Sequence, residues 1–220
     1  MPRIARSVVD GLIYHILNRG NGGQIVFRKE QDYRVFIELI SSARIEFDIR
    51  IFAYCIMPNH FHIVAMPLRG ENLSNFMHLI MTTHVRRYHK HYGTSGHIWQ
   101  GRYKSFIVQE NNYLLTVLRY VEGNPVRAKL VNSAVEWEWS SHRERINLIP
   151  NKILSNPLID IPSHWTKFVD EPLSFNDLEK LRNSINRQAP YGEEEWQIQI
   201  CKNLGLESTI RPRGRPAKWR

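Results

Sequence analysis

A chain of 220 residues with 42% hydrophobic and 23% charged side chains can bury a globular core, which excludes wholesale disorder. Thirty Lys and Arg against 21 Asp and Glu give a formal net charge of +9, which favours a polyanionic partner: nucleic acid first, an anionic membrane surface second. No run approaches the ~18 apolar residues of a membrane span, the start is a poor signal peptide, and the two cysteines lack a disulfide framework. We therefore expect a cytoplasmic, nucleoid-associated protein that does not act at a membrane.

The first 150 residues alternate between strand and helix patterns, with Gly, Pro and Asn at the ends of the patterns. In chain order we predict a strand over 12–18, a helix over 32–47, strands over 49–57 and 60–66, a helix over 73–92, a strand over 103–108 and a helix over 112–122. Only Pro58 and Asn59 separate the second and third strands, which predicts an antiparallel hairpin. The order β-α-β-β-α-β-α predicts an α+β sandwich with a central, mostly antiparallel sheet flanked by helices.

Charge divides the chain into three parts. Residues 1–150 hold 19 basic and 12 acidic side chains, residues 151–210 hold six and nine, and residues 211–220 hold five and none. Prolines at 150, 157 and 162 interrupt any regular pattern at the first boundary. We predict a main domain over 1–150, a small helical accessory region over 151–210 with two short helices within 175–206, and a basic tail over 211–220. The accessory region could contact DNA or mask the basic surface, and its sequence leaves both open.

Two histidines stand out in the strand predicted after Pro58 and Asn59. On a strand, His60 and His62 project from one face while Phe61 and Ile63 project from the other. Two imidazoles so placed can chelate one divalent metal ion, but they can equally be polar residues on a solvent-exposed face. The residues alone leave both readings open, and no Cys or second His pair has the spacing of a closed zinc site.

The helix predicted over 112–122 carries a tyrosine pair. Its apolar stripe consists of Leu114, Val117, Leu118 and Val121. Tyr113 and Tyr120 share another face, which Asn124 joins one turn later. Pro125 disfavours helical geometry at Asn124, so we expect a distorted last turn there. Tyr120 could be functional or could simply pack.

Aromatic and basic residues alternate over 97–106. Trp99 and Tyr103 are candidate stacking platforms for nucleobases, and Arg102 and Lys104 are candidate phosphate contacts. The same pattern is compatible with a loop and strand that only pack.

Three motifs follow one another in order: YCIMPNHFHIVAMP, GHIWQGRYKSFIV and YLLTVLRYVEGNPVRAKLV. Over roughly residues 8–145 they resemble the single-tyrosine HUH transposases, and more closely their REP-associated branch. This resemblance implies the HUH, ferredoxin-like fold. It also implies metal-dependent cleavage and strand transfer of single-stranded DNA beside REP-like hairpins, through a 5′-phosphotyrosine intermediate. The REP-associated branch further implies a monomer rather than a dimer.

The resemblance also assigns residues. His60 and His62 occupy the positions of the family's ligands for Mg²⁺ or Mn²⁺. Tyr120, four residues before the Asn of Asn-Pro, occupies the position of the nucleophile. Asn124 stands where relatives often have a polar metal ligand such as Gln, one methylene longer. Arg127 is expected to contact DNA. A phenol with a pKa of about 10 is mostly protonated near neutrality, so Tyr120 needs a base, a metal-bound hydroxide or the local field to react.

The basic tail resembles an AT-hook, whose Arg-Gly-Arg-Pro core lies in the narrow minor groove of A·T-rich duplex DNA. Arg211, Arg213, Gly214 and Arg215 are its candidate contacts, although a basic end that adds only non-specific affinity is the alternative. For the whole chain, two rivals to the transposase remain: a non-catalytic protein that binds hairpin or A·T-rich DNA, and a metal-dependent hydrolase that uses water.

Overall fold

The computed structural model describes residues 8–211. Its elements follow in the order β1 (Ile13–Arg19), η1 (Asn21–Gly23), α1 (Glu30–Glu46), β2 (Ile49–Met57), β3 (His60–Pro67), α2 (Gly70–Tyr92), β4 (Lys104–Val108), α3 (Asn112–Glu122), α4 (Asn124–Arg127), η2 (Ala134–Glu136), α5 (His142–Arg145), α6 (Trp165–Asp170), α7 (Phe175–Arg187), α8 (Glu194–Leu204) and α9 (Glu207–Ile210). Within the described part of the chain, no helix is long and apolar enough to cross a membrane.

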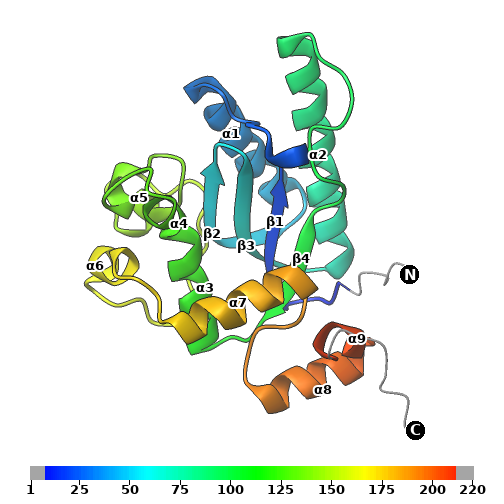
Figure 1. The fold of residues 1–220 in the computed structure, drawn as a ribbon, viewed down its shortest axis with the longest axis vertical. Coiled ribbons are helices and arrows are strands. Elements are labelled where there is room, and N and C mark those ends of the chain that lie inside the picture. Colours follow the sequence, from blue (N-terminus) through cyan, green and yellow to red (C-terminus); the bar gives the residue numbers. More distant parts are fainter. Residues whose placement is uncertain (1–7, 212–220) are drawn as a thin grey trace, which may run out of the picture.

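The four strands form one antiparallel sheet in the order β2-β3-β1-β4. Helices α1 and α2 cover one face of this sheet, and α3 lies on the other with α6 and α7 (Figure 1). Helix α8 packs against the edge of the core beneath α1 and α2. The predicted α+β fold, including the hairpin of β2 and β3, is therefore confirmed.

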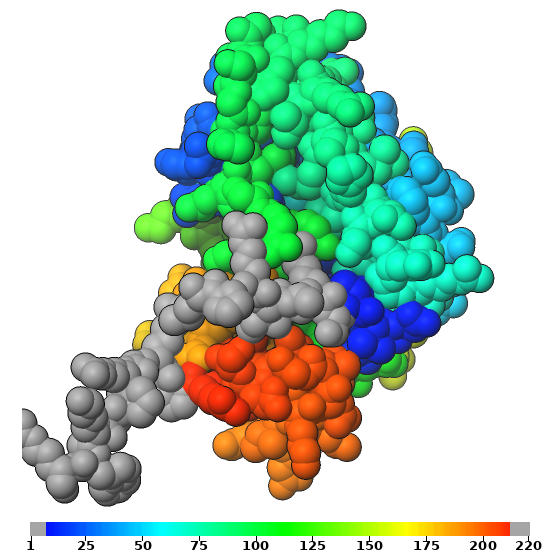
Figure 2. All heavy atoms as spheres, turned by 90° about the vertical axis from the view of Figure 1, so that its right-hand side faces the viewer, coloured from blue at the N-terminus to red at the C-terminus, as the bar shows by residue number. Residues whose placement is uncertain are grey.

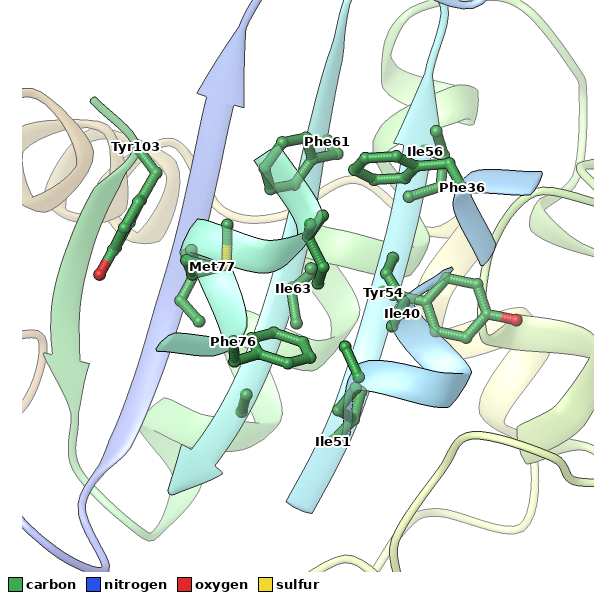
Figure 3. Close-up of a cluster of buried hydrophobic side chains, with 14 of the residues drawn as sticks. Phe36, Ile40, Ile51, Tyr54, Ile56, Phe61, Ile63, Phe76, Met77 and Tyr103 are labelled. Atoms are coloured by element: carbon green, nitrogen blue, oxygen red, sulfur yellow. The ribbon is translucent and has the colours of Figure 1, made fainter. Parts of the chain in front are cut away.

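The side chains of β3 alternate between two hydrophobic cores. Phe61 and Ile63 enter the core beneath α1 and α2, where Phe36 and Phe76 also lie (Figure 3). The neighbouring Val64 enters the second core, beneath α3. Because successive side chains of a strand point to opposite faces, His60 and His62 lie on the α3 side of the sheet. The alternation of side chains along β3, expected from the sequence, thus places the two histidines on the face of the sheet that α3 covers.

Helix α1 begins two residues before the predicted start. The side chain of Asp32 accepts hydrogen bonds from the backbone N–H groups of Arg28 and Lys29, at 2.9 and 3.2 Å. Asp32 therefore lies within the first turn of the helix, and its side chain bonds back to the residues before that turn. Similarly, α2 begins at Gly70, whose N–H donates to Asp10 Oδ1 at 2.6 Å. Both differences come from side chains that satisfy the unpaired N–H groups of a helix start.

Later segments of the chain cover both outer strands of the sheet. Beyond β4, Tyr191 donates its N–H to Ile107 O at 2.7 Å and accepts one from Gln109 N at 2.9 Å. Beyond β2, the backbone of Trp139 and Ser141 pairs with Ile56 and Tyr54, at 2.8 and 2.9 Å. Leu181 and Tyr191 also enter the core beneath α3. Residues after 150 thus pair with β4 and contribute to both cores, since Ile153 enters the core beneath α1 and α2. A domain boundary at residue 150 stays a prediction.

Candidate active site

His62 lies buried beneath α3 and is hydrogen-bonded to a third histidine. Only 3% of His62 is exposed, and its Nδ1 lies 2.8 Å from Nε2 of the fully buried His15 on β1. His15 stands opposite Val64 in the β1–β3 register, which makes it a diagonal neighbour of His62. Sequence reasoning missed His15. A signal was present, since His15 is the one polar side chain between Ile13 and Leu17 on that face of the strand.

The orientation of His60 is set by Asn59. The amide of Asn59 donates to Gly23 O at 3.1 Å, so its oxygen faces His60 and accepts a hydrogen bond from Nδ1 at 2.7 Å. The lone pair of His60 therefore lies on Nε2, which faces the side-chain amide of Asn124 at 3.4 Å. Nε2 is the nitrogen that a metal ion would bind, and a rotation of the Asn124 amide would bring its oxygen to the same point.

All three histidines are held neutral. Burial, followed by the positive charges of Arg19 and Arg127, lowers the pKa of His60 to about 4. Burial lowers the pKa of His15 to about 3, and burial together with its two histidine neighbours lowers the pKa of His62 well below its ordinary value. Neutral imidazole is the form that ligates metals, so the site has this form ready at neutral pH.

Tyr120 projects from α3 towards the histidines. Its ring centre lies 5.8 Å from that of His62 and 6.1 Å from that of His15. The N-cap of α3 is Asn111, whose side chain accepts a hydrogen bond from Tyr113 N at 2.9 Å. Tyr113 itself packs edge-on against Tyr191, with ring centres 5.1 Å apart. Of the two tyrosines on α3, it is Tyr120 that meets the histidine cluster.

The chain bends directly after Tyr120. Helix α3 ends at Glu122, and Asn124 begins the separate turn α4, which is the distortion expected before Pro125. Gly123 lets the backbone at the bend pass close to the carbonyl groups of Arg119 and Val169, because a Cβ there would lie 3.0 Å from Arg119 O and 3.1 Å from Val169 O. The bend directs Asn124 at His60 while Tyr120 stays over His62.

Arg127 brings positive charge to the site. Its Nη2 donates to Tyr120 O at 2.8 Å, and its guanidinium carbon lies 3.9 Å from the centre of the Tyr120 ring. Arg19 is exposed and stands opposite His60 in the β1–β3 ladder. Two guanidinium groups thus flank His60, in positions suited to a phosphate.

A buried carboxylate fixes the end of α3. Glu122 is fully buried and accepts four side-chain hydrogen bonds, from Ser141 Oγ at 2.6 Å, His142 Nδ1 at 3.0 Å, Arg145 Nε at 2.8 Å and Trp165 Nε1 at 2.7 Å. Burial alone would raise its pKa, but Arg145 and the hydrogen bond from His142 outweigh burial and lower the pKa to about 2. Sequence reasoning missed Glu122 because a glutamate in the last turn of a helix ordinarily faces water.

The aromatic residues of the 97–106 segment lie elsewhere than expected. Trp99 and Tyr103 are only 4% and 8% exposed and belong to the core beneath α1 and α2. The prediction that they offer open faces for base stacking is therefore wrong, because their rings are buried in the core against the sheet. Arg102 and Lys104 are exposed and stay candidates for phosphate contacts.

The AT-hook-like tail falls almost entirely outside the described residues. Arg211 is described and exposed, whereas Arg213, Gly214 and Arg215 lie beyond the last described position.

The comparisons with known proteins concern the family and the fold of the chain. A family model described as "Transposase IS200 like" matches residues 8–124, more than half of the chain, and the chain belongs to this family. It is also a distant homologue of the REP-associated tyrosine transposases. A Haemophilus influenzae protein provisionally designated with that name is 28% identical over 122 residues, which cover 50% of this chain and 69% of the relative. A solved REP-associated tyrosine transposase, bound to a REP hairpin, shares the fold with a TM-score of 0.56 and 17% identity, over 74% of this chain and 96% of that one.

Proposed function

We propose that this protein cleaves and rejoins single-stranded DNA beside REP-like hairpins, with Tyr120 as the nucleophile. The observation that carries this proposal is that Tyr120 lies beside His62 and beneath Arg127, on the face of the sheet that also holds His60. A protein that only binds DNA has no chemical need for that combination. The related structure bound to a REP hairpin supports the choice of substrate class.

The bond changes follow from the nucleophile. The Tyr120 oxygen attacks the scissile phosphorus and gives up its proton, and a bond from phosphorus to the tyrosine oxygen forms. The bond from phosphorus to the 3′ oxygen breaks and that oxygen takes up a proton, so no net proton is gained or lost. One DNA end leaves as a 3′-hydroxyl and the other stays as a 5′-phosphotyrosine. Because the phosphodiester count is unchanged, the reverse attack by a 3′-hydroxyl can rejoin strands. Arg127 and Arg19 lie where they would neutralise charge on the phosphate.

The side chains present fit a divalent cation. His60 Nε2 carries a lone pair, the imidazoles are neutral, and the Asn124 amide faces the same point. We propose His60, His62 and Asn124 as its protein ligands, with Mg²⁺ or Mn²⁺ as the ion. When bound, such an ion supplies Lewis-acid polarisation of the phosphate oxygen. Within residues 8–211, no cluster of three or more His, Cys, Asp or Glu side chains is arranged to hold a metal, so water molecules would complete the coordination.

One experiment tests this function. Purified protein is mixed with labelled single-stranded hairpin DNA from around its own gene, with Mn²⁺ or with EDTA, and resolved on a denaturing gel. We expect a metal-dependent covalent adduct in the wild type and none in His60→Ala or His62→Ala. Adduct formation at the wild-type level in both variants would exclude this metal site. Retarded DNA on a native gel without any adduct would support the non-catalytic reading instead.

His15 is expected to act through His62. For His62 to bind a metal through Nε2, its Nδ1 must carry the proton and donate it to His15 Nε2. We expect His15→Phe to weaken Mn²⁺ binding about 10- to 100-fold, the usual cost of removing the hydrogen-bond partner of a ligating histidine. Isothermal titration of Mn²⁺ into the protein measures this loss directly.

The matched control is His84→Phe. His84 is also buried, at 6% exposure, but it projects from α2 against Phe36 of α1, on the other side of the sheet. Equal Mn²⁺ affinities in the two variants would show that His15 does not position His62.

We further propose that the protein acts as a monomer, because its own later segments already pair with both outer strands of the sheet. Contact of the tail with the minor groove of A·T-rich duplex DNA stays a proposal based on its sequence alone.

A further inference from the structure

A groove runs along α2 on the face of the sheet opposite Tyr120. It lies between α2 and the segment 96–103 and has a volume of about 730 Å³. The two walls follow one another in the chain and lie side by side on the molecular face shown in Figure 2. Its lining is mainly apolar: Met81 and Val85 of α2 are half-buried and line the groove, while Met77 and Ile98 lie buried at its base.

The rim of this groove is basic. Arg86 from one wall and Arg102 from the other are both exposed, and among the described residues no Asp or Glu lines the groove. The described salt bridges involve neither arginine. Two unpaired guanidinium groups above an apolar floor suit a ligand that is anionic along one edge and apolar along the other.

Single-stranded DNA has this chemistry. Its phosphates match the arginines, and its unpaired bases can cover the apolar floor. In a duplex the bases stack inside the helix and could not reach that floor. An acidic peptide would match the charges but not the apolar area. The side of α2 from Ser74 to Arg86 measures about 18 Å along the helix axis, room for about five stacked nucleotides.

The groove is connected to the candidate active site through two hydrogen bonds to β1. Gln100 N donates to Arg19 O at 2.8 Å, and Asn18 Nδ2 donates to Gly101 O at 3.2 Å. Arg19 stands opposite His60 in the β1–β3 ladder. The segment that forms one wall of the groove is therefore attached to the end of the sheet that holds His60.

We propose that this groove binds the single-stranded DNA flank that continues from the strand cleaved at Tyr120. This inference rests on the proposed function, and it adds a second contact region on the other side of the sheet. The groove would hold several nucleotides of the flank away from the reacting phosphate, by base contact with the floor and phosphate contact with Arg86 and Arg102.

A matched pair of arginines tests the proposal. Arg86 lines the groove, whereas Arg87, the next residue of α2, lines a separate hollow between α1 and α2. Binding of a fluorescein-labelled oligothymidine of about ten nucleotides is measured by anisotropy over a salt series, with the full-length protein. We expect Arg86→Ala and Arg102→Ala each to weaken binding about threefold or more and to reduce the slope of log affinity against log salt by about 0.7. Arg87→Ala should leave the slope unchanged.

Equal slopes and affinities in Arg86→Ala, Arg102→Ala and Arg87→Ala would overturn the groove as a DNA site. The adduct assay on the wild type is run in parallel and separates the two proposals. An adduct without any difference among the arginine variants means that the groove proposal fails and the proposed function stands. If only Arg86→Ala and Arg102→Ala weaken oligothymidine binding and the wild type forms no adduct, the groove binds single strands but the proposed cleavage function fails.

Discussion

Tyr120→Phe should form no covalent DNA adduct, a loss of at least about a thousandfold, because phenylalanine offers no oxygen to attack phosphorus. The substituted ring keeps its place beneath the Arg127 guanidinium and beside His62, and phenylalanine retains the attraction of a cation to a ring face. The fold and DNA binding should therefore survive. Adduct on a denaturing gel and retardation on a native gel measure the two properties separately.

Tyr113→Phe is the matched control for this prediction. Tyr113 lies on the same helix two turns earlier, but it packs against Tyr191. We expect this variant to form adduct at the wild-type rate. An adduct that persists in Tyr120→Phe, or that disappears only in Tyr113→Phe, would contradict the assignment of the nucleophile.

Glu122→Ala should destabilise the protein by about 3–5 kcal/mol, because removing one partner of a buried ion pair leaves the other charge unpaired. Arg145, with only 5% of its side chain exposed, would lose its carboxylate partner at 2.8 Å. His142 and Trp165 would lose their acceptor as well. The midpoint and slope of urea unfolding give the free energy of unfolding.

Glu138→Ala provides the comparison. Glu138 also pairs with an arginine at 2.8 Å, Arg143, but its side chain is 51% exposed. Its loss should cost less than about 1 kcal/mol, as is usual for a pair in contact with water. A similar loss of unfolding free energy in Glu122→Ala and Glu138→Ala would mean that burial does not determine how much the Glu122 cluster contributes to stability.

The same carboxylate should make stability sensitive to acid. The pKa of Glu122 is lowered from 4.5 to about 2 in the folded protein, so folding favours its charged form. Its contribution to the free energy of unfolding is fully present above about pH 4.5 and is lost as the pH falls towards 2. Urea unfolding of the wild type and of Glu122→Gln is measured at pH 7 and pH 3. The difference between their free energies of unfolding should be smaller at pH 3. A constant difference would contradict the lowered pKa.

The sequence predicted the site residues that local periodicity can place. Strand alternation put His60 and His62 on one face, and helical spacing put Asn124 one turn after Tyr120. Local patterns could not choose between Tyr113 and Tyr120, because the choice depends on which side of α3 meets the sheet. The family resemblance chose Tyr120, and the structure brings that residue to the histidines.

The remaining residues of the site depend on contacts that are distant in sequence. His15 joins the cluster because β1 pairs with β3, 47 residues later. Glu122 is buried because α5 and α6 cover it. Trp99 was predicted to be functional but belongs to the core. Aromatic residues interleaved with basic ones give the same sequence pattern whether their rings pack in a core or stack on nucleobases. In each case the tertiary neighbours, not the local pattern, decide what the side chain does.

The covering of the outer strands has a consequence during synthesis. Strand β4 is complete at Val108, but its outer edge is paired only when Tyr191 has been made, about 83 residues later. At about 5–20 residues per second, that edge stays open for roughly 4–17 s on the ribosome. During this interval the nascent chain presents an unpaired strand edge to its neighbours. Translation speed over residues 109–191 therefore sets how long the unfinished protein is exposed to mispairing.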